Sequence, residues 1–337
     1  MKELKLNLPS GGYTITVGRG ILDQSDKYFN LKRRVFILTD DGVPEDYADA
    51  IAEASLKPII YTVEAGEGSK SLTVLEGVLE AMMHAGITRT DCLVAVGGGV
   101  VGDLGGFAAA TYMRGIDFYN VPTTMLAQVD SSIGGKTAVN LGTVKNIVGA
   151  FHQPKGVLID VEVLKTLDGR QLSAGLAEAV KMSLTSDKAL FEKFEKESVT
   201  DENIEDIIVD ALMIKKNVVE IDEKESGLRK ILNFGHTLGH GIEADSGLGG
   251  LYHGECVALG MLPMCSPSVK ERLIKVLKSL SLPTEYNGSI DNALMYVSHD
   301  KKCDGSDISA ILVPEVGEYS IKKFSVDDYI SYVKERI

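Results

Sequence analysis

Three of the six histidines in this 337-residue chain fall between positions 236 and 253. His236 and His240 are four residues apart, so they share one face of a predicted helix, and His253 opens the next helical segment. Neutral imidazoles are good ligands for Zn²⁺ or a similar divalent ion, and a carboxylate commonly completes such a site. Glu178 is the candidate, because it interrupts an apolar helical stretch in which a buried carboxylate needs a partner. These residues predict a metal site that uses at least two of the histidines; the alternative is core or surface histidines without a metal.

The segment HTLGH resembles part of a metalloprotease signature, but the glutamate required after the first histidine is Thr237 here. Asn233 lies three residues before His236, so Asn233, His236 and His240 are expected on one helical face. Lys181 lies three residues after Glu178 and shares its face. Basic residues on the neighbouring segments are Arg229, Lys215 and Lys216. Amide, imidazole, guanidinium and ammonium groups together suit an anionic polyhydroxy substrate held against a metal.

A glycine-rich turn follows the predicted strand Asp91–Val96. Gly97, Gly98 and Gly99 lead into a helix that carries Asp103 in its first turn. Glycines there let the backbone approach a phosphate, with helix N–H groups pointing at it. A carboxylate beside phosphate is repulsive unless it contacts a hydroxyl or an amide, so the ribose or nicotinamide end of a dinucleotide is favoured. The alternative is a tight strand–helix turn without a ligand, because the pattern GxGxxG alone is weak.

The next segment is rich in Gly, Ser, Thr, Asn and Lys, yet apolar residues interrupt it, which indicates ordered loops. It contains Thr123, Thr124, Asp130, Lys136, Lys145 and Asn146. Lysines among small polar residues suit phosphate or carboxylate binding, because ammonium is a compact point charge. The alternatives are a polar surface loop, or a simple salt bridge between Asp130 and Lys136.

Composition excludes several classes of function. The net charge of −13 argues against nucleic acid and anionic membranes as partners. No apolar run is long enough for a membrane span, and the N-terminus alternates polar and apolar residues rather than resembling a signal peptide. The cysteines, Cys92, Cys256, Cys265 and Cys303, are scattered, as expected for free thiols in a reducing compartment. We therefore expect a cytoplasmic protein.

Two kinds of periodicity divide the chain near residue 160. Before it, strands at Arg34–Asp40, Pro58–Val63 and Asp91–Val96 alternate with helices at Pro44–Glu53 and Leu72–His84, which predicts a parallel sheet covered by helices. After it, the pattern is helical at Leu172–Leu184, Lys188–Lys196, Ile204–Val219, Leu232–Ala244, Gly254–Met264 and Val269–Ser279, with a β-like stretch at Ile308–Val313. The expected fold class is α/β, with a Rossmann-like parallel-sheet domain over 1–160 and a mainly α-helical domain over 161–337.

Several motifs in register carry a resemblance to a known family. GGGVVGDLGGFAAATYMRG, VPTTMLAQVDSSIGGKTAVN, KNIVGAFHQP, AGLAEAVK, GLRKILNFGHTLGHGIEA and HGECVALG occur here in order. Together they resemble the motif series of 3-dehydroquinate synthases, in the sugar phosphate cyclase superfamily, over residues from about 35 to 260. The resemblance implies conversion of 3-deoxy-D-arabino-heptulosonate 7-phosphate to 3-dehydroquinate and phosphate. The steps implied are transient oxidation by NAD, β-elimination of phosphate, reduction, ring opening and aldol closure, assisted by a divalent metal, Zn or Co.

The resemblance also implies roles for individual residues. Metal ligands would be Glu178, His236 and His253, with His240 on the substrate side. Substrate contacts would be Asp130, Lys136, Asn146, Lys181, Lys215, Arg229 and Asn233, together with Lys301 or Lys302. Arg114 resembles a residue that reaches the phosphate bound by a neighbouring subunit, which implies a homodimer. The first domain would bind NAD through Gly66, Glu67, Lys70, Gly98, Gly99, Val100, Val101, Gly102, Asp103, Thr123, Thr124, Lys136 and Lys145, and the second would bind metal and substrate.

Three departures from the family pattern stand out. Ala65 replaces an aspartate before Gly66, a change expected to weaken NAD binding unless Glu64 substitutes. Residues 261–269 are short against the family, and Pro263 and Pro267 are expected to break a helix there. Cys256 replaces a common alanine. The alternatives are a cyclase acting on sedoheptulose 7-phosphate or an amino analogue, a metal-dependent polyol dehydrogenase, and a non-catalytic NAD-binding protein.

Overall fold

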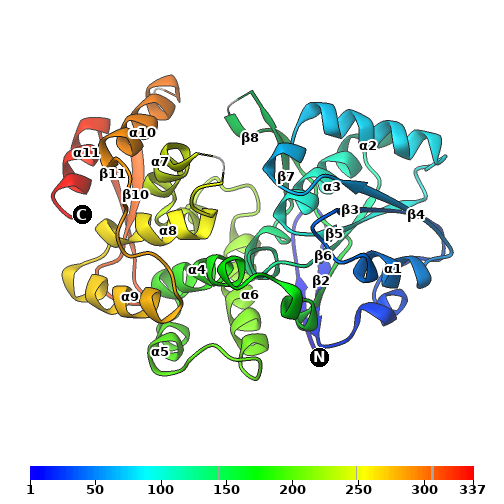
Figure 1. The fold of residues 1–337 in the computed structure, drawn as a ribbon, viewed down its shortest axis with the longest axis horizontal. Coiled ribbons are helices and arrows are strands. Elements are labelled where there is room, and N and C mark those ends of the chain that lie inside the picture. The colour runs from blue at the N-terminus through cyan, green and yellow to red at the C-terminus, as the bar shows by residue number, and fades with distance from the viewer. Residues whose placement is uncertain (143, 248, 305–306) are drawn as a thin grey trace. The chain divides into compact units, whose positions relative to one another are not determined.

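The computed structural model describes residues 1–142, 144–247, 249–304 and 307–337, with only the backbone for 299–304. The chain divides into two compact units, Met1–Leu167 and Asp168–Ile337, and each is described by itself (Figure 1). No helix of the described residues is long and apolar enough to cross a membrane.

The first unit is built on a seven-stranded sheet with the order β1-β2-β9-β6-β5-β3-β4. All neighbouring pairs are parallel except β1 with β2 at one edge. The strands are β1 (Lys2–Leu6), β2 (Tyr13–Gly18), β3 (Arg34–Asp40), β4 (Lys57–Val63), β5 (Cys92–Gly97), β6 (Asp117–Pro122) and β9 (Gly156–Asp160). The predicted parallel sheet is confirmed, including the bounds of β3.

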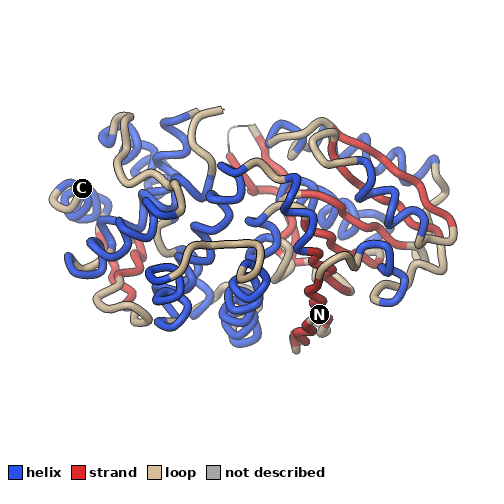
Figure 2. The backbone as a smooth tube through the Cα atoms, turned by 60° about the horizontal axis from the view of Figure 1, so that its bottom comes forward, coloured by secondary structure: helices blue, strands red, loops and turns tan. Residues whose placement is uncertain are grey.

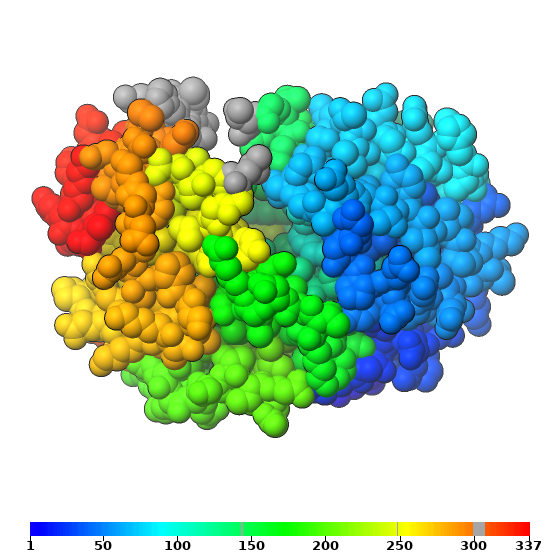
Figure 3. Space-filling view, in the orientation of Figure 1, coloured from blue at the N-terminus to red at the C-terminus, as the bar shows by residue number. Residues whose placement is uncertain are grey.

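Helices cover both faces of this sheet, because successive side chains of a strand point to opposite faces. In β3, Phe36 and Leu38 join a buried cluster with α2 (Leu72–His84) and α3 (Gly99–Thr111). Val35 and Ile37 join a second cluster with α1 (Glu45–Glu53) and the 3₁₀ turn Leu22–Lys27. The first unit therefore has two apolar cores, and α1 and α2 lie at its surface in blue and cyan (Figure 3).

The segment predicted as ordered loops is a β-hairpin. A π-helix, Ala127–Ser131, precedes β7 (Lys136–Leu141) and β8 (Val144–Phe151), which pair antiparallel and pack on α3. The loop prediction was wrong here because Gly, Ser, Thr and Asn obscure strand alternation. The hairpin gives Lys136, Lys145 and Asn146 fixed positions on strands.

The second unit is mainly helical, as predicted, with one two-stranded ribbon (Figure 2). Its helices are α4 (Gly169–Ser186), α5 (Lys188–Lys196), α6 (Ile204–Ile221), α7 (His236–Ser246), α8 (His253–Met261), α9 (Pro267–Ser279), α10 (Ile290–Asp304) and α11 (Val326–Lys334), and the ribbon pairs β10 (Ile308–Leu312) with β11 (Ser320–Phe324). The predicted break at Pro263 and Pro267 is confirmed: α8 ends at Met261, a 3₁₀ turn covers Leu262–Met264, and α9 begins at Pro267.

Close backbone approach holds α8 against two other helices. A Cβ at Gly254 would overlap the carbonyl oxygen of Ala174 in α4, and one at Gly260 would overlap that of Gly235, just before α7. Because neither position has room for a side chain, glycine permits α8 to touch both neighbours. This contact brings the start of α8, with His253, beside the part of α4 that carries Glu178.

We predict that Gly254→Ala lowers the free energy of unfolding by about 1–3 kcal/mol, because the added methyl forces α8 away from α4. Urea unfolding of the metal-free protein measures this effect. Gly169→Ala is the matched control, since its Cβ would meet nothing within 4 Å at the start of α4. Equal stability of the two variants would show that the α4–α8 contact tolerates a side chain.

Candidate metal centre and substrate site

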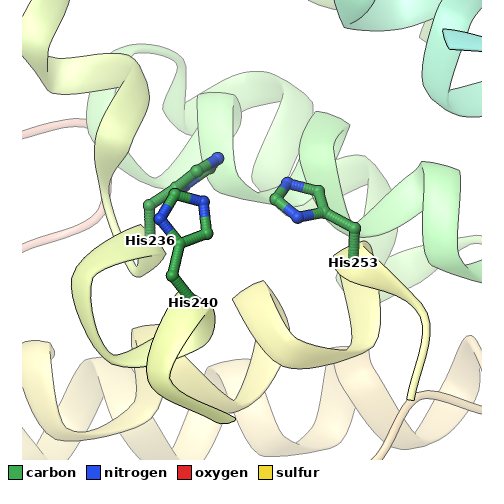
Figure 4. Close-up of side chains that lie close together, drawn as sticks. All are labelled: His236, His240 and His253. Atoms are coloured by element: carbon green, nitrogen blue, oxygen red, sulfur yellow. The ribbon is translucent and has the colours of Figure 1, made fainter. Parts of the chain in front are cut away.

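Three imidazole rings face one another in the second unit. His236 and His240 extend from α7, and His253 opens α8, with its ring turned toward the other two (Figure 4). The ring centroid of His253 lies 5.2 Å from that of His236 and 5.8 Å from that of His240. One nitrogen from each ring lies within 4.8 Å of one from each other ring. This geometry suits a single divalent ion.

Glu178 supplies a carboxylate at the same place. Its side chain is fully buried on α4, and Oε1 lies 3.9 Å from Nε2 of His236 and 3.6 Å from Nε2 of His253. Lys181 forms an ion pair with Oε2, yet neither carboxylate oxygen accepts a hydrogen bond of good geometry from the described residues. A buried carboxylate in this state needs a further cation. Carboxylate and imidazole are ligands for Zn²⁺ or Co²⁺, so the residues fit such an ion.

Backbone and side-chain acceptors orient two of the rings. Nδ1 of His236 lies 3.2 Å from the carbonyl oxygen of Phe234, and Nδ1 of His253 lies 3.4 Å from Oε2 of Glu243. An acceptor at Nδ1 places the ring proton there, so the lone pair of each Nε2 is directed toward Glu178. Glu178, His236 and His253 therefore present three lone-pair donors to one point.

Burial and nearby charges shift the pKa values of His236 and His253 in opposite directions. Burial, and then the charge of Lys181, hold the pKa of His236 well below its ordinary value. Burial also lowers the pKa of His253, but its hydrogen bond to Glu243 and the charge of Glu178 outweigh burial and raise it. His236 is thus a neutral imidazole, the form that binds metal.

The predicted common face of Asn233, His236 and His240 is wrong. The helix predicted over Leu232–Ala244 is split: a 3₁₀ turn covers Leu228–Asn233, and α7 begins only at His236. Gly235 separates them with φ 77°, a left-handed conformation that stops the helical repeat. Asn233 therefore reaches its position from the preceding turn.

Further polar groups of the second unit are buried. Lys215 on α6 is 4% exposed, and Arg229 in the 3₁₀ turn is 2% exposed. The Asn233 amide donates to Oε1 of Glu225 over 2.6 Å, and Glu225 has a left-handed φ of 60°. Our sequence reasoning did not select Glu225, because a glutamate in a charged loop gives no local signal.

In the first unit, the glycine-rich turn lies at the carboxyl ends of two neighbouring strands. β5 ends at Gly97 and β6 at Pro122, and the Thr123 N–H donates to the Gly97 carbonyl over 3.0 Å. Helix α3 begins at Gly99, so the N–H groups of its first turn point out of the sheet edge. A phosphate would therefore be favoured at the first turn of α3, and Thr124 lies beside Gly98 at its start.

A buried lysine connects residues predicted for cofactor and substrate. Lys70 is 5% exposed. Its Nζ donates to Oδ2 of Asp103 over 2.7 Å and to Oδ1 of Asn146. The same Nζ lies 3.7 Å from Oε1 of Glu67. Asn140 bonds to both Glu67 and the backbone of Asn146. Asp103, expected to contact a hydroxyl or an amide, is thus held by an ammonium group.

The remaining predicted residues occupy exposed or partly buried positions. Arg114 is exposed with φ 68°, Lys136 opens β7, and Lys145 is exposed on β8, while Asp130 is half-buried in the π-helix. Gly66 precedes a 3₁₀ turn with φ 107°, and the N–H of Ala65 donates to Asp41. Lys301 and Lys302 lie among residues 299–306, whose side chains are outside the described part. Of the predicted site residues other than glycine, Arg114 and Asn146 have left-handed backbones, a strain common at functional sites.

Both units of the chain are similar in sequence to proteins of one known family. The family described as "3-dehydroquinate synthase N-terminal" matches residues 60–174, and "3-dehydroquinate synthase C-terminal" matches residues 175–303. The chain is 41% identical to the 3-dehydroquinate synthase of Streptococcus sanguinis (strain SK36), with 99% of this chain and 100% of that protein aligned. The chain belongs to the 3-dehydroquinate synthase family. The resemblance inferred from the motifs is therefore confirmed.

Solved structures of related cyclases share the fold of this 3-dehydroquinate synthase family member. A 2-deoxy-scyllo-inosose synthase complexed with carbaglucose-6-phosphate, NAD⁺ and Co²⁺ has a TM-score of 0.87 at 26% identity, with complete coverage of both chains. A 2-epi-5-epi-valiolone synthase from Streptomyces hygroscopicus with NAD⁺ and Zn²⁺ bound has a TM-score of 0.87 at 25% identity, covering 98% of this chain and 97% of that one.

We predict that Glu243→Gln weakens binding of Zn²⁺ or Co²⁺ by about 10- to 100-fold, because an amide oxygen holds Nδ1–H of His253 less firmly than a carboxylate. Titration of the metal-free protein with Co²⁺, followed by its visible spectrum, measures this without catalysis. The control Glu192→Gln makes the same change at a glutamate paired with Lys196 on α5. Unchanged affinity in Glu243→Gln would mean that His253 needs no orienting carboxylate.

Proposed function

We propose that this protein converts 3-deoxy-D-arabino-heptulosonate 7-phosphate to 3-dehydroquinate and phosphate, with NAD and a divalent metal, Zn²⁺ or Co²⁺, as cofactors. The observation that carries the proposal is the buried Glu178 carboxylate, which faces two Nε2 atoms in a chain related to 3-dehydroquinate synthases over its whole length. Without a metal, the negative charge of that buried carboxylate would be only partly neutralised, by Lys181.

We assign the metal to Glu178, His236 and His253, and place His240 on the substrate side. The orientation of the His236 and His253 rings supports the assignment, because their Nδ1 atoms already have acceptors. When bound, the metal would supply Lewis acidity at a substrate oxygen, and NAD would supply reversible hydride acceptance. Lys181 would hold Glu178 in place through its ion pair.

Basic side chains suit the two anionic groups of this substrate, its carboxylate and its phosphate. In the second unit these are Lys215 and Arg229, with the Asn233 amide for a hydroxyl group. Family resemblance adds Asp130, Lys136, Asn146 and Lys301 to the substrate contacts. It also assigns Arg114 to the phosphate bound by a neighbouring subunit, so we propose a homodimer.

We propose that NAD binds at the carboxyl ends of β5 and β6. The first turn of α3 would face the pyrophosphate, and Thr123 and Thr124 follow the end of the neighbouring strand β6. Glu67, Lys70 and Asp103 already form one ion-paired group, which would require little reorganisation on binding. Lys145 and Gly66 would complete the contacts, and Ala65 would weaken them relative to aspartate.

The alternative substrate, sedoheptulose 7-phosphate, gains no support from these observations. Identity to the streptococcal 3-dehydroquinate synthase exceeds that to either cyclase structure. Cys92, Cys256 and Cys265 are free and buried, which supports a reducing compartment, and we propose the cytoplasm.

The deciding experiment measures phosphate release from 3-deoxy-D-arabino-heptulosonate 7-phosphate, with and without EDTA and added NAD. We expect release that requires both metal and NAD, without accumulation of NADH, because the cofactor is regenerated. Release from sedoheptulose 7-phosphate alone would replace the proposed substrate, and NADH accumulating with a polyol would indicate a dehydrogenase.

We predict that His253→Ala loses most bound metal and activity, because one of three ligands is removed. His240→Ala should retain metal but lose activity, and Lys136→Ala should do the same. Metal content by elemental analysis, together with phosphate release, distinguishes the three. Full metal content in His253→Ala, or metal loss in His240→Ala, would contradict the ligand assignment.

A further inference from the structure

Asp222 accepts four hydrogen bonds from the loop that follows it. It is the first residue after α6, and it is 8% exposed. Oδ1 accepts from the N–H of Ser226 over 2.9 Å and from its hydroxyl over 3.1 Å. Oδ2 accepts from the N–H of Gly227 over 2.7 Å and from that of Arg229 over 3.0 Å. One carboxylate therefore fixes the course of residues 222–229.

Arg229 is tied to this loop at both ends. Its backbone N–H donates to Asp222, and its guanidinium Nη1 donates to the Glu223 carbonyl over 2.5 Å. The same loop contains Glu225, whose carboxylate accepts from the Asn233 amide. The positions of two proposed substrate groups, the guanidinium and the amide, thus depend on how the loop is folded.

The carboxylate is held in its ionised form. Burial raises the pKa of Asp222, but the N–H groups of Arg229, Gly227 and Ser226 outweigh it and lower that pKa to about 2. The charge is thus present throughout the neutral range. Lys215, a third proposed substrate group, lies on α6, the helix that Asp222 ends.

We propose that Asp222 is a positioning residue: its carboxylate folds the 222–229 loop and so directs Arg229 and Asn233 to the anionic substrate. The substrate's identity rests on the proposed function, whereas the loop's dependence on Asp222 does not. Asparagine cannot replace it, because the NH₂ group that replaces one oxygen cannot accept a hydrogen bond. Either orientation of the amide would set an NH₂ group against at least one backbone N–H.

The test compares Asp222→Asn with Asp210→Asn, the same change on α6 at a residue paired with Lys193 outside the site. Amide hydrogen exchange is measured at Ser226, Gly227 and Arg229. We expect exchange at these amides to accelerate about 10-fold or more in Asp222→Asn and to stay unchanged in Asp210→Asn. Unaltered exchange in Asp222→Asn would overturn the proposal whatever the catalytic activity.

Kinetics then test whether the effect passes through Arg229. Asp222→Asn should lower kcat/KM for the heptulosonate phosphate by roughly 10- to 100-fold, with full metal content, while Asp210→Asn stays at the wild-type value. In an Arg229→Ala background, the same change should lower kcat/KM by a clearly smaller factor than in the wild type, because only the positioning of Asn233 is then left to lose. Losses that multiply in the double variant would refute positioning through Arg229. A wild-type protein without cyclase activity would refute the proposed function, and amide exchange would still decide on Asp222.

Discussion

The carboxylate of Glu178 lies inside a helical unit, where an ionised group without compensating charge would cost several kcal/mol. Lys181 neutralises one side of it, and Nε2 of His236 and of His253 faces the other. A divalent cation between them would satisfy all three lone-pair donors at once. The packing of α8 serves this arrangement, since Gly254 and Gly260 let its backbone touch α4 and the residue before α7. A larger residue at either place would separate the ligands.

Four of the groups proposed to act on metal or substrate, His236, His253, Arg229 and Asn233, are held by neighbouring groups. Phe234 and Glu243 set the orientation of two imidazoles, and Asp222 folds the loop that carries Arg229. Preorganisation of this kind reduces the rotamer freedom lost when substrate binds. The left-handed backbone of Glu225 is consistent with it, because strain persists only where surrounding contacts determine the conformation.

In the first unit, the ammonium group of Lys70 holds two proposed site residues in the same way. Lys70 joins Asp103, at the glycine-rich turn, to Asn146, on a hairpin strand far along the sequence. A residue proposed for NAD and one proposed for substrate therefore share one buried ammonium group. The parallel sheet makes this possible, because the carboxyl ends of its strands bring separate loops to one edge.

Local sequence pattern determined much of this protein: the apolar run of β3, the bounds of α2 and the helical pattern after residue 160 were all readable from the sequence. The residue types of the metal site were readable as well, because histidine and glutamate in apolar surroundings point to a ligand. Tertiary structure decided the rest. The hairpin of β7 and β8, the break at Gly235 and the contacts of Glu225, Glu243 and Asp222 left no local signal. Each depends on which backbone or side chain approaches from elsewhere, and that approach is set by packing between segments rather than by the repeat within one.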